Sequence, residues 1–317
     1  MLIMIQLNTS ADKTLNIFLS NTNKALREVL KDIAPKEMQQ LSQAKDLGSI
    51  LESLLKNRPQ DQLQNQTLLT LLKNNPTLKE LGNVSTTLKE LQQLLQKNET
   101  PMLNRLKIVV VKSLENITNI DENSLKNKIE NSGLFLESKL KNASSKQEIQ
   151  ELLSNDTKAV VKKSLEELNT ASLPNKDTVM KQLDKLSMQI DYYQLLSHLN
   201  DASALYLPYS FDALEEGNIT IKNAKNKKFF CDIDLQLKEY GSLRLRLGLF
   251  EKNQLNINIS CESPELKDLL HSNIKDLKKS LYDVGIIPTD IRFLDAADVQ
   301  MPYGSGEEIE LGFEVKA

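Results

Sequence analysis

Three successive segments between residues 231 and 261 alternate strictly between apolar and polar side chains. The apolar set is Cys231, Ile233, Leu235, Leu237, Leu243, Leu245, Leu247, Leu249, Leu255, Ile257, Ile259 and Cys261. Because successive side chains of a β-strand point to opposite faces, this period predicts three strands that bury one face of a sheet and expose the other to solvent. An amphipathic stretch from Pro264 to Val284, closed by Gly285, predicts a helix over the buried face.

Shorter segments on either side extend the predicted sheet. Residues 204–209 and 218–221 are expected to form short strands before the three, and residues 291–294 one strand after them. We therefore predict an antiparallel sheet of about five strands packed by one helix, within a module spanning residues 204–295. The helix residues predicted to face the sheet are Leu266, Leu270, Ile274, Leu277, Leu281 and Val284. A first hairpin turning through residues 238–242 would place Asp234 opposite Arg246 and Gln236 opposite Arg244.

The first 200 residues follow a different period, because their apolar side chains recur every three or four positions, as in helices. One helix is expected from Pro35 to about Lys56. Another is indicated by a narrow stripe that would pack against a neighbouring element: Val179, Leu183, Leu186, Ile190 and Tyr193. The overall prediction is an α+β chain whose N-terminal two-thirds, residues 1–200, are mostly helical and partly flexible.

The acidic tail, residues 296–317, alternates again at Ile309, Leu311, Phe313 and Val315. This period predicts a further strand, added either to its own sheet or to the edge of a partner's sheet. Proximity favours its own sheet.

Signals for catalysis, cofactors and metals are missing from the sequence. The two histidines, His198 and His271, each stand alone on a predicted helix without a metal-ligand spacing. The two cysteines lie on the apolar phase of their strands, which indicates inert core thiols. Asp232 and Asp234 share one strand face but are better explained as solvated partners of the next strand than as a carboxylate dyad. We predict that the protein is not an enzyme and binds no cofactor or metal.

Charge and hydropathy limit the classes of partner that the chain is expected to bind. Residues 1–200 hold 26 Lys+Arg against 23 Asp+Glu, and residues 201–317 hold 14 against 20. Neither part is basic enough for a nucleic-acid footprint. No apolar run approaches the about 20 residues of a membrane span, and Met1–Leu7 lacks the basic start of a secretory signal. The expected partner is therefore another protein.

The module resembles the C-terminal domain of flagellar hook-length control proteins. The resemblance lies in the order of a strand, a turn with Gly241, alternating strands, and a Pro-opened helix that ends at Gly285 before the last strand. The matching stretches are residues 235–247, residues 255–266, Leu269-Leu270, Leu277, Leu281 and Val284-Gly285-Ile286, with Leu205–Pro208 upstream.

The resemblance implies a regulatory substrate of the flagellar type III export machinery. In such proteins the N-terminal part enters the growing hook among hook or hook-cap subunits. The C-terminal domain then contacts the cytoplasmic domain of the export switch protein, and export changes from hook to filament subunits. The chain would be cytoplasmic and then exported. The residues we expect to contribute to the switch-protein contact are Tyr240, Gly241, Arg244, Arg246 and Phe250.

Two other functions stay open at this point. One is a cytoplasmic helical adaptor or chaperone of the export system, and the other is a structural component of the hook or its cap.

Overall fold

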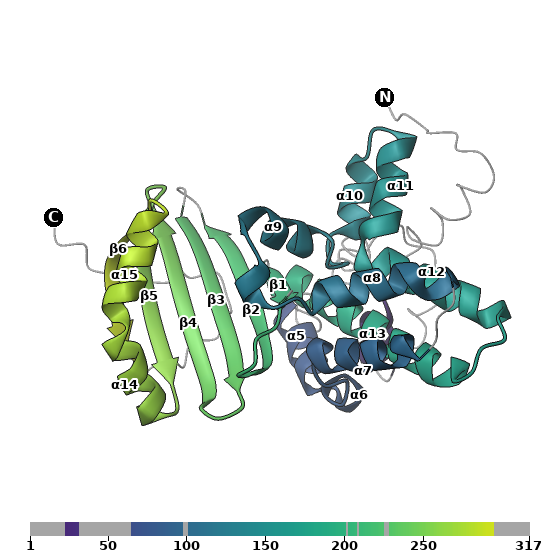
Figure 1. Cartoon of the computed structure of the whole chain (residues 1–317), viewed down its shortest axis with the longest axis horizontal. Coiled ribbons are helices and arrows are strands. Elements are labelled where there is room, and N and C mark those ends of the chain that lie inside the picture. Colours follow the sequence, from purple (N-terminus) through teal and green to yellow (C-terminus); the bar gives the residue numbers. More distant parts are fainter. Residues whose placement is uncertain are drawn as a thin grey trace.

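The computed structural model describes residues 23–31, 65–97, 101–200, 202–207, 209–224 and 228–294. Within these ranges a helical region precedes a six-stranded sheet that carries two further helices, and Figure 1 shows the two parts side by side. The fold is α+β, as the two periodicities predict. The predicted helix at Pro35–Lys56 and the predicted strand in the tail lie outside the described residues.

The helical region is built around one long helix, α13, which contacts α2, α5, α7 and α12. Polar side chains begin most of the helices: the side-chain oxygens of Asn23, Asn83 and Asp156, for example, accept hydrogen bonds from the first-turn backbone N–H groups. The helices are α2 (Lys24–Leu30), α5 (Asn65–Asn74), α6 (Pro76–Lys79), α7 (Val84–Gln96), α8 (Asn104–Ser113), α9 (Glu122–Glu130), α10 (Leu136–Asn142), α11 (Lys146–Asn155), α12 (Thr157–Thr170) and α13 (Lys176–Asn200), with 3-10 turns η1 (Pro101–Leu103) and η2 (Ile117–Asn119).

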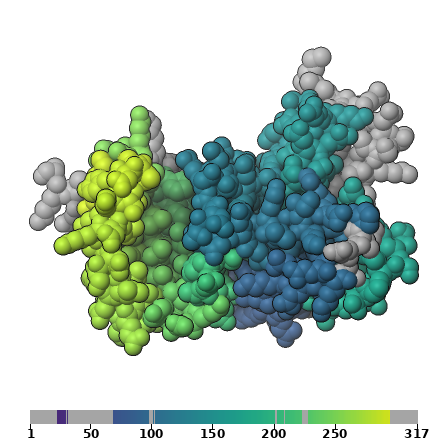
Figure 2. Space-filling view, viewed as in Figure 1, coloured from purple at the N-terminus to yellow at the C-terminus, as the bar shows by residue number. Residues whose placement is uncertain are grey.

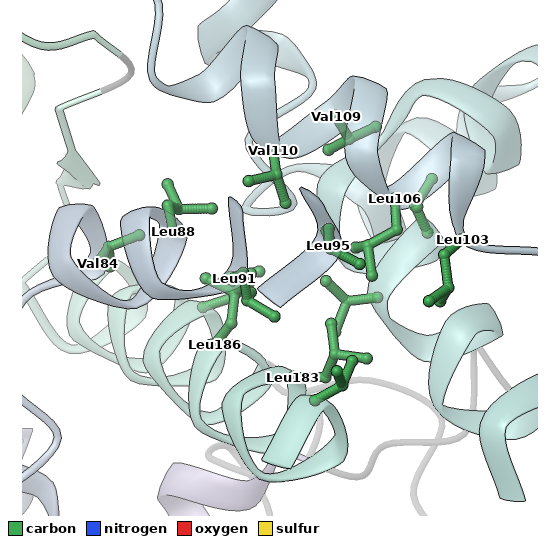
Figure 3. Close-up of a cluster of buried hydrophobic side chains, with 14 of the residues drawn as sticks. Val84, Leu88, Leu91, Leu95, Leu103, Leu106, Val109, Val110, Leu183 and Leu186 are labelled. Carbon is green, nitrogen blue, oxygen red and sulfur yellow. The ribbon is translucent and has the colours of Figure 1, made fainter. Parts of the chain in front are cut away.

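The main core of this region lies where α7, α8, α12 and α13 meet (Figure 3). Leu91 of α7 and Leu183 of α13 are fully buried there, together with Leu106 of α8. The predicted stripe on α13 is confirmed, since Val179, Leu183, Leu186 and Ile190 all belong to this core and Tyr193 packs against it. This helix is therefore held by its neighbours within a bundle.

A buried ionic cluster ties three of the helices together. Lys158 of α12, whose side chain is only 5% exposed, pairs with Glu137 of α10 at 2.6 Å and with Asp191 of α13 at 3.0 Å. Burial alone would lower the pKa of Lys158, but the two carboxylates raise it above its usual value. Asp191 also accepts a hydrogen bond from the Lys24 backbone N–H at 2.8 Å, so the same carboxylate anchors the start of α2.

The sheet contains six strands in sequence order, β1 (Ser203–Tyr206), β2 (Leu214–Ala224), β3 (Lys228–Leu237), β4 (Gly241–Phe250), β5 (Gln254–Cys261) and β6 (Ile287–Phe293). The first five pair antiparallel, but β6 runs parallel to β5. The prediction of about five antiparallel strands is therefore corrected. The chain between β5 and β6 crosses the sheet as helix and returns to the starting end, which makes the two strands parallel.

Two helices replace the single predicted one: α14 (Pro264–Ser272) and α15 (Ile274–Asp283) meet at Asn273. Ser263 caps α14, with its hydroxyl accepting from the Leu266 N–H at 3.1 Å. Of the six residues predicted to face the sheet, Leu266 is buried and Leu270 and Leu281 pack on the sheet's core. Leu277 and Val284 are instead 38% and 73% exposed.

The helical region and the sheet share a packed junction. Strand β1 lies against α13, and the ring of Tyr206 enters the helical core while its hydroxyl donates to the Ser132 carbonyl at 2.6 Å. Gly217 in β2 leaves room within the sheet itself for the side chains of Leu207 and Leu235. A Cβ there would lie 2.3 Å from Cδ1 of Leu207 and 2.8 Å from Cδ2 of Leu235.

Candidate functional site

The polar face of the sheet carries a ladder of ion pairs across β3 and β4. Arg246 lies 3.0 Å from Asp232 and Arg244 lies 2.5 Å from Asp234. The predicted pairing of Asp234 with Arg246 is wrong by two residues, because the turn spans only residues 238–240 and β4 begins at Gly241. Each arginine therefore faces a carboxylate. The ladder presents hydrogen-bonding groups with little net charge.

An aromatic pair lies at one end of the same polar face. The rings of Phe230 and Phe250 meet edge to face, with 5.9 Å between their centroids, and the Lys228 ammonium lies 5.8 Å from the Phe250 centroid. Gly248 is buried beneath them. A Cβ at that position would lie 3.0 Å from Phe250 and 3.3 Å from Phe230. The glycine thus lets both rings lie close to the strand.

At the other end, the ladder borders a recess of about 360 Å³ between the sheet and the start of α7. Asp234, Gln236 and Arg244 line it from the sheet, and Asn83 and Ser85 line it from α7. This recess joins the polar face to the helical region, so a partner lying on Arg244 would also meet the first turn of α7.

The five predicted contact residues do not form one patch. Arg244, Arg246 and Phe250 share the polar face of β4. Tyr240 lies in the β3–β4 turn and packs on the core of the opposite, apolar face. Gly241 opens β4 with φ at +71°, a value that favours glycine. The structure therefore brings three of the five together and places the other two at the turn.

The apolar face shows a feature that sequence reasoning missed. Strand register places Ile219, Ile233, Leu245 and Ile259 in one row across β2 to β5. The outer members, Ile219 and Ile259, are buried at 7% and 3% exposure, whereas the two central members are only half-buried. In the next row, Cys231 and Leu247 are again half-buried, as is Ile221 on β2, and only Ile257 on β5 is buried. We call these four central residues, Cys231, Ile233, Leu245 and Leu247, the open strip.

The open strip exists because the helices cover only the sides of the sheet. Helix α14 lies on β5 and α15 lies on β6, while Ile129, Leu134 and Phe135 of the helical region cover the strands near β1 and β2. Figure 2 shows the green surface of the strands between the yellow-green surface of α14 and α15 and the blue surface of the helical region. Alternation revealed which face is apolar, but no local pattern reveals how much of that face the helices cover.

Chemical groups that could support catalysis are sparse in the part of the chain that the structure describes. No group of three or more His, Cys, Asp or Glu side chains is placed to hold a metal ion among these residues. Burial, with Asp232 nearby, raises the pKa of the Cys231 thiol to about 11, which keeps it protonated at neutral pH. His271 is stacked on Phe293 of β6 with 3.7 Å between ring centroids. Among the described helices, none has the length and apolar character that crossing a bilayer requires.

Comparison with protein families finds one match, in the C-terminal region of the chain. Residues 217–301 match the model of the flagellar hook-length control protein FliK, a regulatory and non-enzymatic family. The match begins in β2, covers β3 to β6 with α14 and α15, and includes both the ion-pair ladder and the open strip. Comparison with curated proteins and with solved structures finds no match. The C-terminal region of this chain therefore carries a domain of the flagellar hook-length control family.

Proposed function

We propose that the chain is a hook-length control protein, exported through the flagellar type III machinery, whose sheet contacts the cytoplasmic domain of the export switch protein. The family match over residues 217–301 carries this proposal. The chain would be made in the cytoplasm, and its N-terminal part would enter the growing hook among hook or hook-cap subunits. Contact with the switch protein would then change export from hook to filament subunits.

The surface chemistry of the sheet supports a role in protein binding. The open strip leaves four apolar side chains only partly buried on central strands, which in most sheets are the best covered. Its width, two strands at about 4.8 Å spacing, suits one helix of about 10 Å diameter. A helix satisfies its own backbone hydrogen bonds, so it can cover an apolar strip without leaving polar groups unpaired.

The polar face is the second contact surface in this proposal. Arg244, with a side chain 43% exposed, and Phe250 would meet the partner there, with Arg246 between them along β4 and Tyr240 and Gly241 at the turn. Arg244 and Asp234 neutralise each other's charge, so binding of a partner to this face would depend on the geometry of the exposed groups more than on net charge.

A double-swap experiment separates recognition from structural support. In Arg244→Asp with Asp234→Arg, the two charges exchange places and the ion pair can still form. We expect this swap to keep the folding stability of the parent and to lose binding to the switch protein, because the exposed arginine has moved to the neighbouring strand. Single Arg244→Asp, which places two carboxylates opposite each other, is the control that loses stability. A swap variant that binds like the parent would show that Arg244 only supports the sheet.

Deletion of the gene followed by electron microscopy of the flagella tests the function itself. The proposal expects overlong hooks without filaments. Normal hooks carrying normal filaments would refute it.

The packed helical region supports a second candidate, a cytoplasmic adaptor or chaperone of the export system. Its main core contains fully buried side chains from α7, α8 and α13, so this part folds as a bundle. Export through a narrow channel requires that bundle to unfold. Recovery of the chain from the culture medium of a strain assembling hooks supports the exported protein, and recovery only from the cytoplasm supports the adaptor. Stoichiometric amounts in purified hooks would indicate a structural component.

A further inference from the structure

Residues 129–135, which run from the end of α9 to the start of α10, cover the part of the apolar sheet face that borders the open strip. We call them the covering segment. Ile129, Leu134 and Phe135 pack on a buried cluster at the first two strands: Leu205, Leu207, Leu214 and Ile219. Ile219 pairs with Ile233 of the open strip, so the covered and uncovered parts of this face are continuous. Figure 1 shows α9, which ends in this segment, beside β2.

Four successive backbone carbonyls of the covering segment, from Asn131 to Leu134, accept hydrogen bonds from other elements. The first accepts from the N–H and the hydroxyl of Thr157 at the start of α12, at 2.9 and 2.8 Å. The second accepts from the Tyr206 hydroxyl of β1 at 2.6 Å. The last two accept from the side-chain amide of Gln194 on α13, at 3.2 and 3.1 Å. Since α12 and α13 hold three of the four carbonyls, the segment stays in place only while these helices are folded.

The attachment through Gln194 is buried and is linked to the ionic cluster of the helical region. Gln194 is 8% exposed, its amide oxygen accepts from the Lys158 ammonium at 2.5 Å, and its amide nitrogen also donates to Glu137 at 2.8 Å. The backbone of the segment lies against α12, since a Cβ at Gly133 would be 2.9 Å from the Lys158 backbone nitrogen. Movement of α12 or α13 would leave buried polar groups of the segment unpaired. The segment and these two helices therefore release together.

We propose that the covering segment links the folding of α12 and α13 to the width of the apolar face that the sheet offers its partner. This inference rests on the proposed function, in which the N-terminal part unfolds to enter the export channel. While α12 and α13 are folded, the cytoplasmic domain of the switch protein meets the open strip alone. When they unfold, the segment leaves the sheet, and the apolar side chains of β1 and β2 extend the open strip. The sheet then binds its partner more tightly, because binding covers more apolar surface.

Gln194→Met in the full-length chain is designed to release the covering segment while the helices stay folded. The change removes both hydrogen bonds from α13 to the segment, and Lys158 keeps its two carboxylate partners. Gln189→Met is the matched control. Gln189 on the same helix donates in the same way to two carbonyls outside the segment, those of Leu81 and Gly82, at 3.0 and 3.1 Å.

Two measurements report release and binding separately. Hydrogen exchange over residues 129–135, read by mass spectrometry, reports release, and titration calorimetry with the cytoplasmic domain of the switch protein reports binding. We expect Gln194→Met to exchange about tenfold faster there and to bind about fivefold more tightly than the parent, since the two lost hydrogen bonds raise the population of the released state. Phe135→Ser, which removes one covering side chain and keeps these hydrogen bonds, should change both in the same direction by less. Gln189→Met should match the parent in both.

The outcomes separate this inference from the proposed contact. Equal binding by the parent and Gln194→Met, with faster exchange over residues 129–135 in the variant, overturns the inference and leaves the contact standing. Weaker binding by Gln194→Met, or equally tighter binding by Gln189→Met, also overturns it. Unchanged exchange in both Gln194→Met and Phe135→Ser overturns it as well, because these contacts would not hold the segment. Absence of binding by the parent and every variant refutes the proposed contact itself and this inference with it.

Discussion

Replacing Lys158 by methionine tests whether the buried ionic cluster holds the helical region together. Lys158 is 5% exposed and Asp191 is 2% exposed at their side chains, so the change leaves the Asp191 carboxylate buried beside an uncharged thioether. Removing one partner of a buried ion pair costs about 3–5 kcal/mol of folding free energy. Glu137 also loses its ion-pair partner, but it still accepts a hydrogen bond from Gln194 at 2.8 Å and is 30% exposed, so its share is smaller.

Urea denaturation monitored by circular dichroism measures this cost. We expect the free energy of unfolding of Lys158→Met to fall by about 3–5 kcal/mol at pH 7.5. The matched control is Lys163→Met on the same helix, where the side chain is 70% exposed and lies 3.9 Å from Glu167. An exposed pair of this kind contributes about 0.3–0.5 kcal/mol.

The dependence on pH gives this prediction a second test. Burial alone would raise the pKa of the Glu137 carboxyl, but Lys158 lowers it in the folded parent below its usual value of 4.5, and the variant loses this effect. The stability that this pair gives the parent is present above the unfolded pKa and is lost as the pH falls below it, so the deficit of Lys158→Met relative to the parent shrinks between pH 7.5 and about pH 4. A loss below about 1 kcal/mol, or a deficit that is the same at both pH values, would show that the buried ion pairs of Lys158 do not hold these helices together.

Three further changes have defined outcomes. Burial raises the pKa of Asp156 from 3.8 to about 7, so between these pH values the folded chain holds a proton that the unfolded chain has lost, and the folded state loses stability as the pH rises. Asp156→Asn keeps the cap of α12 and should flatten this part of the curve of stability against pH. An unchanged slope would contradict the raised pKa of Asp156. Gly217→Ala should cost about 1–3 kcal/mol in urea unfolding, because its Cβ would overlap Leu207 and Leu235. A neutral effect would show that these two side chains can move aside. Leu91→Ala in the main helical core should cost about 2–5 kcal/mol in the same assay, and a loss below about 1 kcal/mol would contradict the fully buried position of Leu91.

The three central strands and the long helix α13 were predictable because they rest on local periodicity. Alternation over residues 231–261 located β3, β4 and β5, and the apolar stripe from Val179 to Tyr193 located α13. The single helix predicted from Pro264 to Val284 is instead divided at Asn273 into α14 and α15.

The features that were missed depend on contacts between distant segments. The pairing of Asp234 with Arg244 was set by the length of the β3–β4 turn, and a change of two residues in that turn shifts every partner while leaving the faces unchanged. The parallel direction of β6 follows from the helical crossover, which a short apolar run such as residues 291–294 does not encode. The open strip depends on where α14 and α15 lie on the sheet. The sequence of neither helix predicts which strands it will cover.

Titration calorimetry of the full-length chain into the cytoplasmic domain of the flagellar export switch protein measures whether the two proteins bind. We expect saturable binding with a negative heat-capacity change, because covering the open strip removes apolar surface from water. Absence of binding heat at several temperatures, with both proteins folded, would contradict the claim that this sheet recognises that partner.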